Sequence, residues 1–132
     1  MWPFLLLLLA PLHATPDVPP QAKWKEIGTT RTGNPVFINP ASVRTRKDGI
    51  IEATIRVTFT TPVKTPKGNL TASRANAMFD CATRTFAASE NTTYIDEKAN
   101  TIFQKTVNKV PGFGPTIAGN LADVALQHFC PR

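Results

Sequence analysis

The strongest constraint on the fold is a strictly alternating segment near the middle of the chain. From Ile51 to Thr60, every second side chain is apolar and its neighbours are polar. The apolar members are Ile51, Ala53, Ile55, Val57 and Phe59. Successive side chains of a β-strand point to opposite faces of the sheet. The segment from Ile50 to Thr60 is therefore predicted to be a strand with one buried and one exposed face, as in an antiparallel sheet.

A second long strand is predicted from Ala72 to Cys81. Its expected inward residues are Ala75, Ala77, Phe79 and Cys81. Shorter strands are predicted at residues 23–27, 36–38, 92–95 and 102–107, with a loop from Pro62 to Gly68. If the same alternation continued past Cys81, Phe86 would lie on the polar face. We therefore expect either a bulge between Ala82 and Thr85 or a partial cover over that face.

The pattern changes after Pro111, where glycine and proline interrupt the strand period. Gly114 as N-cap and Pro115 as the first helical residue predict a helix that ends at Cys130. Its apolar side chains form two adjoining stripes, Ile117, Leu121, Val124 and His128 beside Ala118, Ala122, Ala125 and Phe129. A wide apolar face on a single helix is typical of packing against a sheet. The predicted fold class is α+β, with a single antiparallel sheet of about six strands and one C-terminal helix packed on it.

The first residues of the chain have the composition of an export signal. Met1 to Leu12 is an uncharged apolar run that is too short to span a bilayer. We predict a signal peptide over residues 1–14, a Pro-rich flexible leader over 15–22 and one folded domain over 23–132. A buried N-terminal strand is the alternative interpretation of this run. The expected product is exported and does not span the membrane.

Two cysteines, Cys81 and Cys130, are present. In an oxidising compartment an even pair most simply forms a disulfide, which would join the end of the helix to the inward face of a long strand. The enclosed loop of about 50 residues corresponds to roughly 4 kcal/mol of stability in the chain-entropy model.

The formal net charge of +6 suggests an acidic partner. Six cations form the predicted polyanion or partner face: Arg44, Arg46, Lys47, Arg56, Arg74 and Arg84. The alternative is an ordinary solvated strand face, because outward strand positions are commonly charged. Nucleic acid is not an expected partner, since export removes the usual targets and no exposed stacking aromatics are evident.

Catalytic chemistry is not expected. His128 lies on the apolar stripe of the helix, where a core or helix-end histidine is favoured over a haem or metal ligand. The acidic pair Asp96-Glu97 falls in a predicted turn, where solvation explains it. The serines have no nucleophile-elbow context. We therefore predict no enzyme activity, no cofactor and no metal site.

Several segments in order resemble the surface-adhesin E-like family of bacterial envelope proteins. They are Trp24 in the opening strand, Val36 to Ser42, Phe79 to Phe86, Tyr94 before a turn, and Pro111-Gly112 before the helix and Cys130. The resemblance implies a sheet of about six strands with a C-terminal helix held by a disulfide. It also implies adhesion to host matrix or serum proteins for some members.

The leading functional hypothesis is therefore a non-enzymatic binding protein of the periplasm or bacterial cell surface that contacts host or envelope macromolecules. One alternative is a periplasmic structural or assembly factor that joins a complex through an edge strand. Another is a small-ligand carrier, for instance of haem, that uses the sheet–helix interface and His128. A homodimer is left open.

Overall fold

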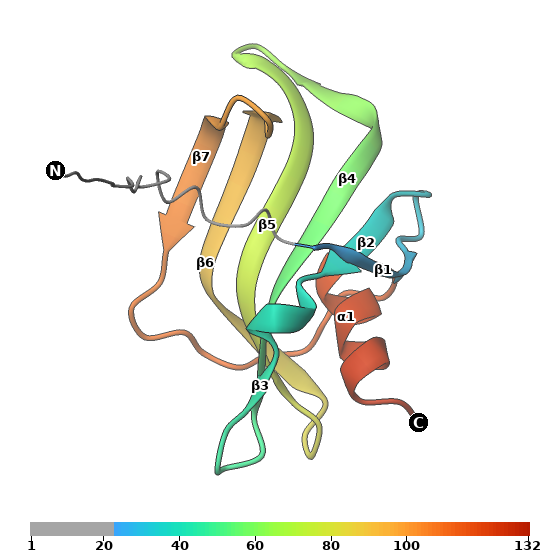
Figure 1. The fold of residues 1–132 in the computed structure, drawn as a ribbon, viewed down its shortest axis with the longest axis vertical. Helices are drawn as coiled ribbons and strands as arrows, with labels where there is room; N and C mark the ends of the chain where they lie inside the picture. The colour runs from blue at the N-terminus through green and yellow to red at the C-terminus, as the bar shows by residue number, and fades with distance from the viewer. Residues whose placement is uncertain (1–22) are drawn as a thin grey trace, which may run out of the picture.

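The computed structural model describes residues 23–132, which form one antiparallel sheet and one C-terminal helix (Figure 1). The strand order is β1-β2-β4-β5-β6-β7, and the short β3 pairs with β4. The strands are β1 (Lys25–Thr29), β2 (Pro35–Ile38), β3 (Arg44–Thr45), β4 (Ile51–Thr65), β5 (Gly68–Asp80), β6 (Thr85–Asp96) and β7 (Thr101–Val107). A 3₁₀ turn, Pro40–Ser42, lies between β2 and β3. The predicted fold class is confirmed.

Helix α1 (Leu121–Phe129) packs on one face of the sheet, near β1, β2 and β4. It buries Ala122, Ala125 and Leu126, so the alanine stripe faces the sheet. The core beneath it includes Ile55 and Phe79, which are among the largest fully buried side chains. The alternation in β4 and β5 therefore divides the sheet into two faces. We call the face that carries α1 the inner face and the opposite one the outer face.

Strands β4 and β5 form a hairpin that is longer than predicted. The expected loop from Pro62 to Gly68 is wrong, because β4 continues to Thr65 and only Pro66 and Lys67 lie between the two strands. A register shift between Thr58 and Val63 accommodates Pro62. The pairing of β2 with β4 ends at Val57, so this part of β4 is an edge strand. Proline is tolerated at an edge or a bulge because its missing N–H is not needed there.

Phe86 lies on the inner face because the chain reverses direction between β5 and β6. The bulge that was expected between Ala82 and Thr85 is not the cause. Strand β5 ends at Asp80, and the pairing of β5 with β6 sets Phe79 opposite Phe86. Directly opposed residues in an antiparallel pair share a face. Phe86 consequently packs against the core. The bulge of this hairpin lies instead at Asn76 and Ala77.

The helix begins later than predicted. Its N-cap is Asn120, whose side chain accepts a hydrogen bond from the Asp123 backbone N–H. Gly114 forms an isolated bridge to Phe86, with N–O distances of 2.9 Å in both directions. Because the backbone groups of Gly114 pair with a strand, the expected helix start at Gly114 and Pro115 is wrong. Ile117, which was placed on the apolar stripe, is 68% exposed.

The predicted disulfide between Cys81 and Cys130 is present, with a Cα–Cα distance of 5.2 Å. It ties the end of α1 to the residue that follows β5. The predicted signal peptide, residues 1–14, and leader, residues 15–22, lie outside the described residues. No helix within residues 23–132 is long and apolar enough to cross a membrane.

Candidate binding surface

The outer face of the sheet carries two arginines side by side. Arg56 on β4 and Arg74 on β5 are cross-strand partners. Both alternate with buried residues of the inner face, so local strand geometry alone sends their side chains outward. Like charges directly opposite each other on a sheet are destabilising unless a counter-charge is present.

Glu97 supplies that counter-charge from the turn between β6 and β7. Its carboxylate accepts hydrogen bonds from Arg56 Nε at 2.9 and 3.0 Å and from Arg56 Nη2 at 2.7 Å. Arg74 Nε donates a further bond at 2.6 Å. The Glu97 side chain is 13% exposed, so the interpretation of Asp96-Glu97 as a purely solvated acidic pair is wrong for Glu97.

Three aromatic side chains surround the two guanidinium groups. Arg56 lies over Trp24 at 5.5 Å and over Phe37 at 5.0 Å from the ring centroids. Arg74 lies over Trp24 at 5.1 Å and over Tyr94 at 5.2 Å. These distances fall within the range of cation–π attraction. We call the six residues Trp24, Phe37, Arg56, Arg74, Tyr94 and Glu97 the arginine cluster.

The electrostatics of the cluster favour an ionised Glu97. Burial by itself raises the pKa of the carboxyl group. Hydrogen bonds from Arg56 and Arg74, together with their positive charges, lower it by more, and the resulting pKa lies below the usual glutamate value. Two arginines and one carboxylate thus leave the arginine cluster with a net positive charge at neutral pH.

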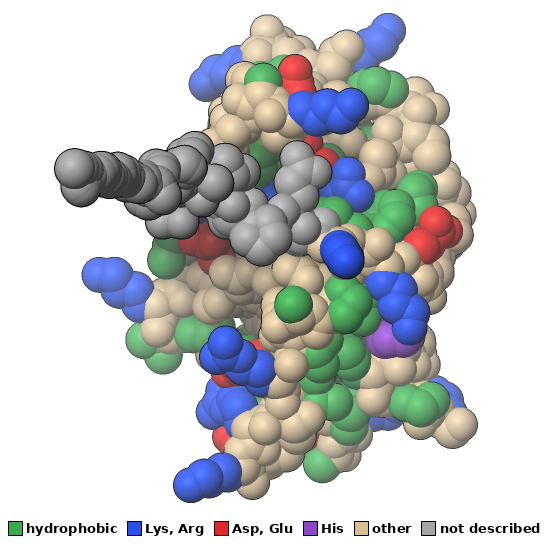
Figure 2. All heavy atoms as spheres, in the orientation of Figure 1, with side chains coloured by type: hydrophobic (Ala, Val, Ile, Leu, Met, Phe, Trp, Pro, Cys, Tyr) green, Lys and Arg blue, Asp and Glu red, His purple; other side chains and the backbone are tan. Residues whose placement is uncertain are grey.

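The structure divides the six predicted cations among three places. Arg56 and Arg74 belong to the arginine cluster. Arg44, Arg46 and Lys47 lie on the β3–β4 hairpin, where Arg46 contacts Asp48 at 2.9 Å and Glu52 at 3.5 Å. Figure 2 shows Lys and Arg side chains distributed over several separate parts of the surface in view.

Arg84 belongs to neither group. Its side chain donates to the backbone oxygen of Cys130 and to Gln127 Oε1. Both acceptors lie at the C-terminal end of α1, where exposed carbonyl oxygens attract cations. This position gives Arg84 a structural role at the helix end. That the remaining five cations, Arg44, Arg46, Lys47, Arg56 and Arg74, form a partner face stays a prediction.

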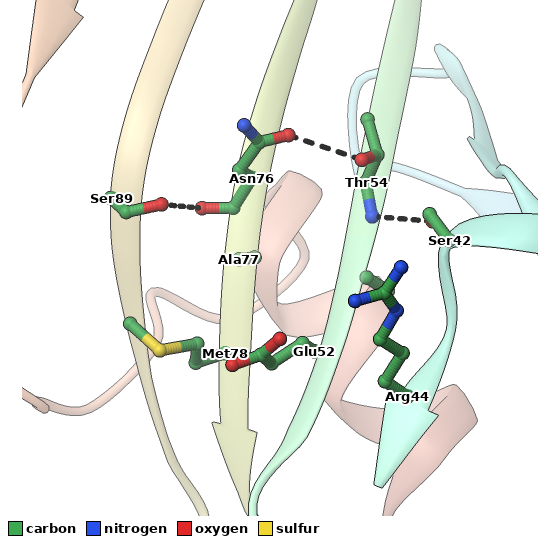
Figure 3. Close-up of a pocket in the computed structure, with 9 residues that line it drawn as sticks. Ser42, Arg44, Glu52, Thr54, Asn76, Ala77, Met78 and Ser89 are labelled. Carbon is green, nitrogen blue, oxygen red and sulfur yellow. Dashed lines mark hydrogen bonds between the residues drawn. The ribbon is translucent and has the colours of Figure 1, made fainter. Parts of the chain in front are cut away.

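A polar trough lies on the outer face beside the β3–β4 hairpin (Figure 3). Its volume is about 370 Å³. The lining comes from the 3₁₀ turn and from strands β3 to β6: Ser42, Arg44, Glu52, Ala53, Thr54, Asn76, Ala77, Met78 and Ser89. The hydrogen bond from Thr54 Oγ1 to Asn76 Oδ1, at 3.1 Å, holds two of its polar side chains in place.

His128 is exposed in the last turn of α1 and meets the Phe129 ring edge-on, at a centroid distance of 5.1 Å. It therefore does not lie inside the sheet–helix interface, which the alternative hypothesis of a haem carrier would use, and it matches the favoured interpretation of a helix-end histidine. Among residues 23–132, no group of three or more His, Cys, Asp or Glu side chains is arranged to hold a metal ion.

Sequence reasoning did not assign Trp24, Phe37 and Tyr94 to this surface, and it also missed Glu97. The available signal was the pair of outward arginines at adjacent strand positions, which needed an acid nearby. Nothing in the sequence, however, indicated that the turn after β6 folds back over β4 and β5.

Comparison with known protein families decides the classification. The model of the family described as surface-adhesin protein E matches residues 24–131. The chain belongs to this family. The match includes all strands, the helix, both cysteines and every residue of the arginine cluster. No curated protein matches the chain.

Solved structures of Haemophilus influenzae protein E resemble this member of the surface-adhesin E family. Crystal form II has a TM-score of 0.54 at 13% identity, and the alignment covers 92% of this chain and 96% of that chain. The selenomethionine form has a TM-score of 0.51 at 14% identity, with 92% of each chain covered. At such low identity the likeness establishes the fold alone.

Proposed function

We propose that this protein is an exported, non-enzymatic adhesin of the bacterial cell envelope that binds host or envelope macromolecules through its outer face. Family membership supports an adhesin-like surface protein. The observation that carries the proposal is the arginine cluster on the sheet face opposite α1. Tryptophan, tyrosine and arginine are the residue types that most often dominate the energy of protein interfaces.

The rigidity of this surface also favours binding. Arg56 and Arg74 are each held by Glu97 and by aromatic rings, so they lose little conformational freedom when a partner docks. Strands rather than loops position both side chains. A pre-organised surface of this kind needs no rearrangement to bind.

The charge of the surface indicates the partner. The arginine cluster has a net positive charge, and the neighbouring β3–β4 hairpin adds Arg44, Arg46 and Lys47. An acidic protein patch or an anionic polymer complements both regions. Association with such a partner weakens as salt screens the charges.

Adhesion is tested with whole cells that express the full chain. Protease added outside the cells is expected to digest the protein, and the cells are expected to adhere to immobilised matrix protein in low salt. The variant Arg44→Gln, Lys47→Gln is expected to reduce adhesion several-fold. The matched control Lys64→Gln, Lys67→Gln changes exposed cations at the tip of the β4–β5 hairpin and is expected to retain it.

Protection of the chain from protease in intact cells would contradict a surface location. Equal adhesion by the hairpin variant and by the control would contradict the proposal that the β3–β4 hairpin is part of the partner face. The two readouts are independent, so each part of the proposal stands or fails separately.

A second candidate function is a periplasmic assembly factor, and the edge of the sheet favours it. Strand β7 ends the strand order, and its residues Ile102 and Val107 are 42% and 60% exposed. A free strand edge can pair with a strand of a partner or of a second copy of the chain. Replacing Gln104 at the centre of β7 with proline is expected to abolish such pairing, which size measurements in solution would detect.

A further inference from the structure

The polar trough contains a guanidinium group that has no partner among the residues that the structure describes. Within residues 23–132, the Arg44 side chain makes no hydrogen bond or ion pair. Figure 3 shows its guanidinium directed along β4 toward Thr54. Arg46, the neighbouring cation on the same hairpin, is already engaged by Asp48 and Glu52. Arg44 is therefore available to an anionic group in the trough.

The other polar groups of the trough are fixed but not saturated. Thr54 Oγ1 donates to Asn76 Oδ1, and the Asn76 amide donates one hydrogen to Glu90 at 3.3 Å. Ser89 Oγ donates to the Asn76 backbone oxygen at 3.4 Å. A hydroxyl oxygen keeps acceptor capacity when it donates, and within residues 23–132 the Asn76 amide uses only one of its two hydrogens. These side chains can therefore hydrogen-bond to hydroxyl groups of a ligand without losing their cross-strand bonds.

The charge balance limits the ligand to few negative charges. Glu52 lines the trough beside Arg44, and Arg46 contacts its carboxylate at 3.5 Å. Glu52 would repel a densely charged anion. A ligand with a single carboxylate can bind Arg44 through that group, while the other groups of the ligand face the hydroxyl and amide side chains. The Met78 side chain adds an apolar, polarisable surface for C–H groups.

The size of the trough fits a small polar ligand. A volume of about 370 Å³ lies at the lower end of the usual range for ligand sites. A second depression of about 160 Å³ adjoins it and shares Thr54 and Asn76. Arg74, Glu90, Thr92 and Tyr94 also line this depression, so it connects the trough with the arginine cluster.

We infer that the polar trough is a binding site for an acidic saccharide, a sugar ring that carries one carboxylate among several hydroxyl groups. Arg44 binds the carboxylate, and Thr54, Asn76 and Ser89 bind the hydroxyls. The inference rests on the proposed adhesin function, because it names the ligand class of the same outer face.

The test measures ligand binding to the secreted, ¹⁵N-labelled protein with its disulfide intact. Binding is detected as changes in the amide chemical shifts. Glucuronate is expected to shift the amides of trough residues saturably. Glucose, which lacks the carboxylate, is expected to bind about tenfold more weakly, because a charge-assisted hydrogen bond is lost. Inorganic sulfate is expected to give no saturable shift in the trough, which separates saccharide recognition from an adventitious anion.

Two variants test which trough side chain binds the carboxylate and which binds the hydroxyl groups. Arg44→Gln is expected to weaken glucuronate binding about tenfold and to leave glucose binding unchanged. Thr54→Val, which keeps the β-branched shape, is expected to weaken the binding of both sugars. Lys67→Gln removes the same charge at the distant β4–β5 turn and is the matched control.

Equal glucuronate affinity in Arg44→Gln and Lys67→Gln would overturn the inference, as would shifts confined to residues outside the trough. If cells adhere but glucuronate does not bind, the inference fails and the adhesin proposal stands. If glucuronate binds to the trough but cells that expose the protein on their surface do not adhere, the adhesin proposal fails instead.

Discussion

The variant Glu97→Gln is expected to destabilise the folded protein by about 2 kcal/mol. Glutamine has nearly the same shape as glutamate, so the variant removes charge with little change in packing. It converts a carboxylate that serves two arginines into a neutral amide. The Glu97 side chain is 13% exposed and that of Arg56 is 19% exposed, so water replaces the lost contacts incompletely.

The magnitude follows from the hydrogen bonds in the arginine cluster. Glutamine offers one acceptor oxygen where glutamate offers two, and its amide NH₂ cannot accept the hydrogen bond that Arg74 Nε donates to Glu97 Oε2. A hydrogen bond to a charged group contributes about 1.5–3 kcal/mol. Both Arg56 and Arg74 donate to Glu97. The loss of one such bond gives about 2 kcal/mol, and the repulsion between the cross-strand arginines acts in the same direction.

The assay is urea unfolding with the disulfide intact, followed by tryptophan fluorescence. For a slope of about 1–2 kcal/mol per molar urea, the midpoint is expected to fall by about 1–2 M. The matched control is Glu90→Gln on β6. Its ion pair with Lys105, at 3.3 Å, is more exposed, so its loss is expected to cost less than about 1 kcal/mol.

The pH dependence provides an independent check. Because the pKa of Glu97 is lower in the folded protein than its usual value, its contribution to stability is complete at neutral pH. That contribution is lost as the pH falls through the usual glutamate value toward the folded one. The stability difference between wild type and Glu97→Gln is therefore expected to shrink in acid. A midpoint shift no larger than that of Glu90→Gln, or a difference that grows in acid, would refute this account.

Three further changes test the rest of the fold in the same unfolding assay. Replacing Cys81 and Cys130 together with serine is expected to cost about 4 kcal/mol, since the bond closes a loop with a sequence separation of 49 residues; an unchanged midpoint would contradict this. Phe79→Ala is expected to cost about 3–5 kcal/mol because the side chain is fully buried, whereas Val63→Ala at the exposed tip of β4 is the control and should change little. Asn120→Ala is expected to cost about 1 kcal/mol through loss of the helix cap, and the same loss from Asn69→Ala, at an exposed position whose side chain makes no hydrogen bond within residues 23–132, would argue against a specific capping effect.

The sequence predicted best those features that depend on neighbouring residues. Alternation in β4 and β5 indicated which side chains face the core, and Ala53, Ile55, Ala75 and Phe79 are indeed buried. The pairing of Cys81 with Cys130 followed from the presence of a single pair of cysteines after the predicted signal peptide and from the expected oxidising compartment. The predicted strand ends were less accurate. Strand β4 passes Pro62 because its neighbour β2 has already ended, and a local pattern contains no information about a neighbour.

The predicted helix start failed for a related reason. Gly114 and Pro115 have the local chemistry of a helix N-terminus, but Phe86 pairs with the backbone of Gly114 and keeps it extended. The chain then reaches Asn120 before the helix begins. A strand contact from a distant segment thus outweighed a local propensity, which is a weak preference by comparison with tertiary contacts.

The amino-acid sequence by itself determined which residues of β4 and β5 are inside and which are outside, because strand geometry fixes the direction of each side chain relative to its neighbours. It also determined that Arg56 and Arg74 point to the same face. The tertiary structure alone decided that Glu97 joins them, across sequence separations of 41 and 23 residues. That meeting depends on how the turn after β6 folds over the sheet, and only the packed chain brings those three charges within hydrogen-bonding distance.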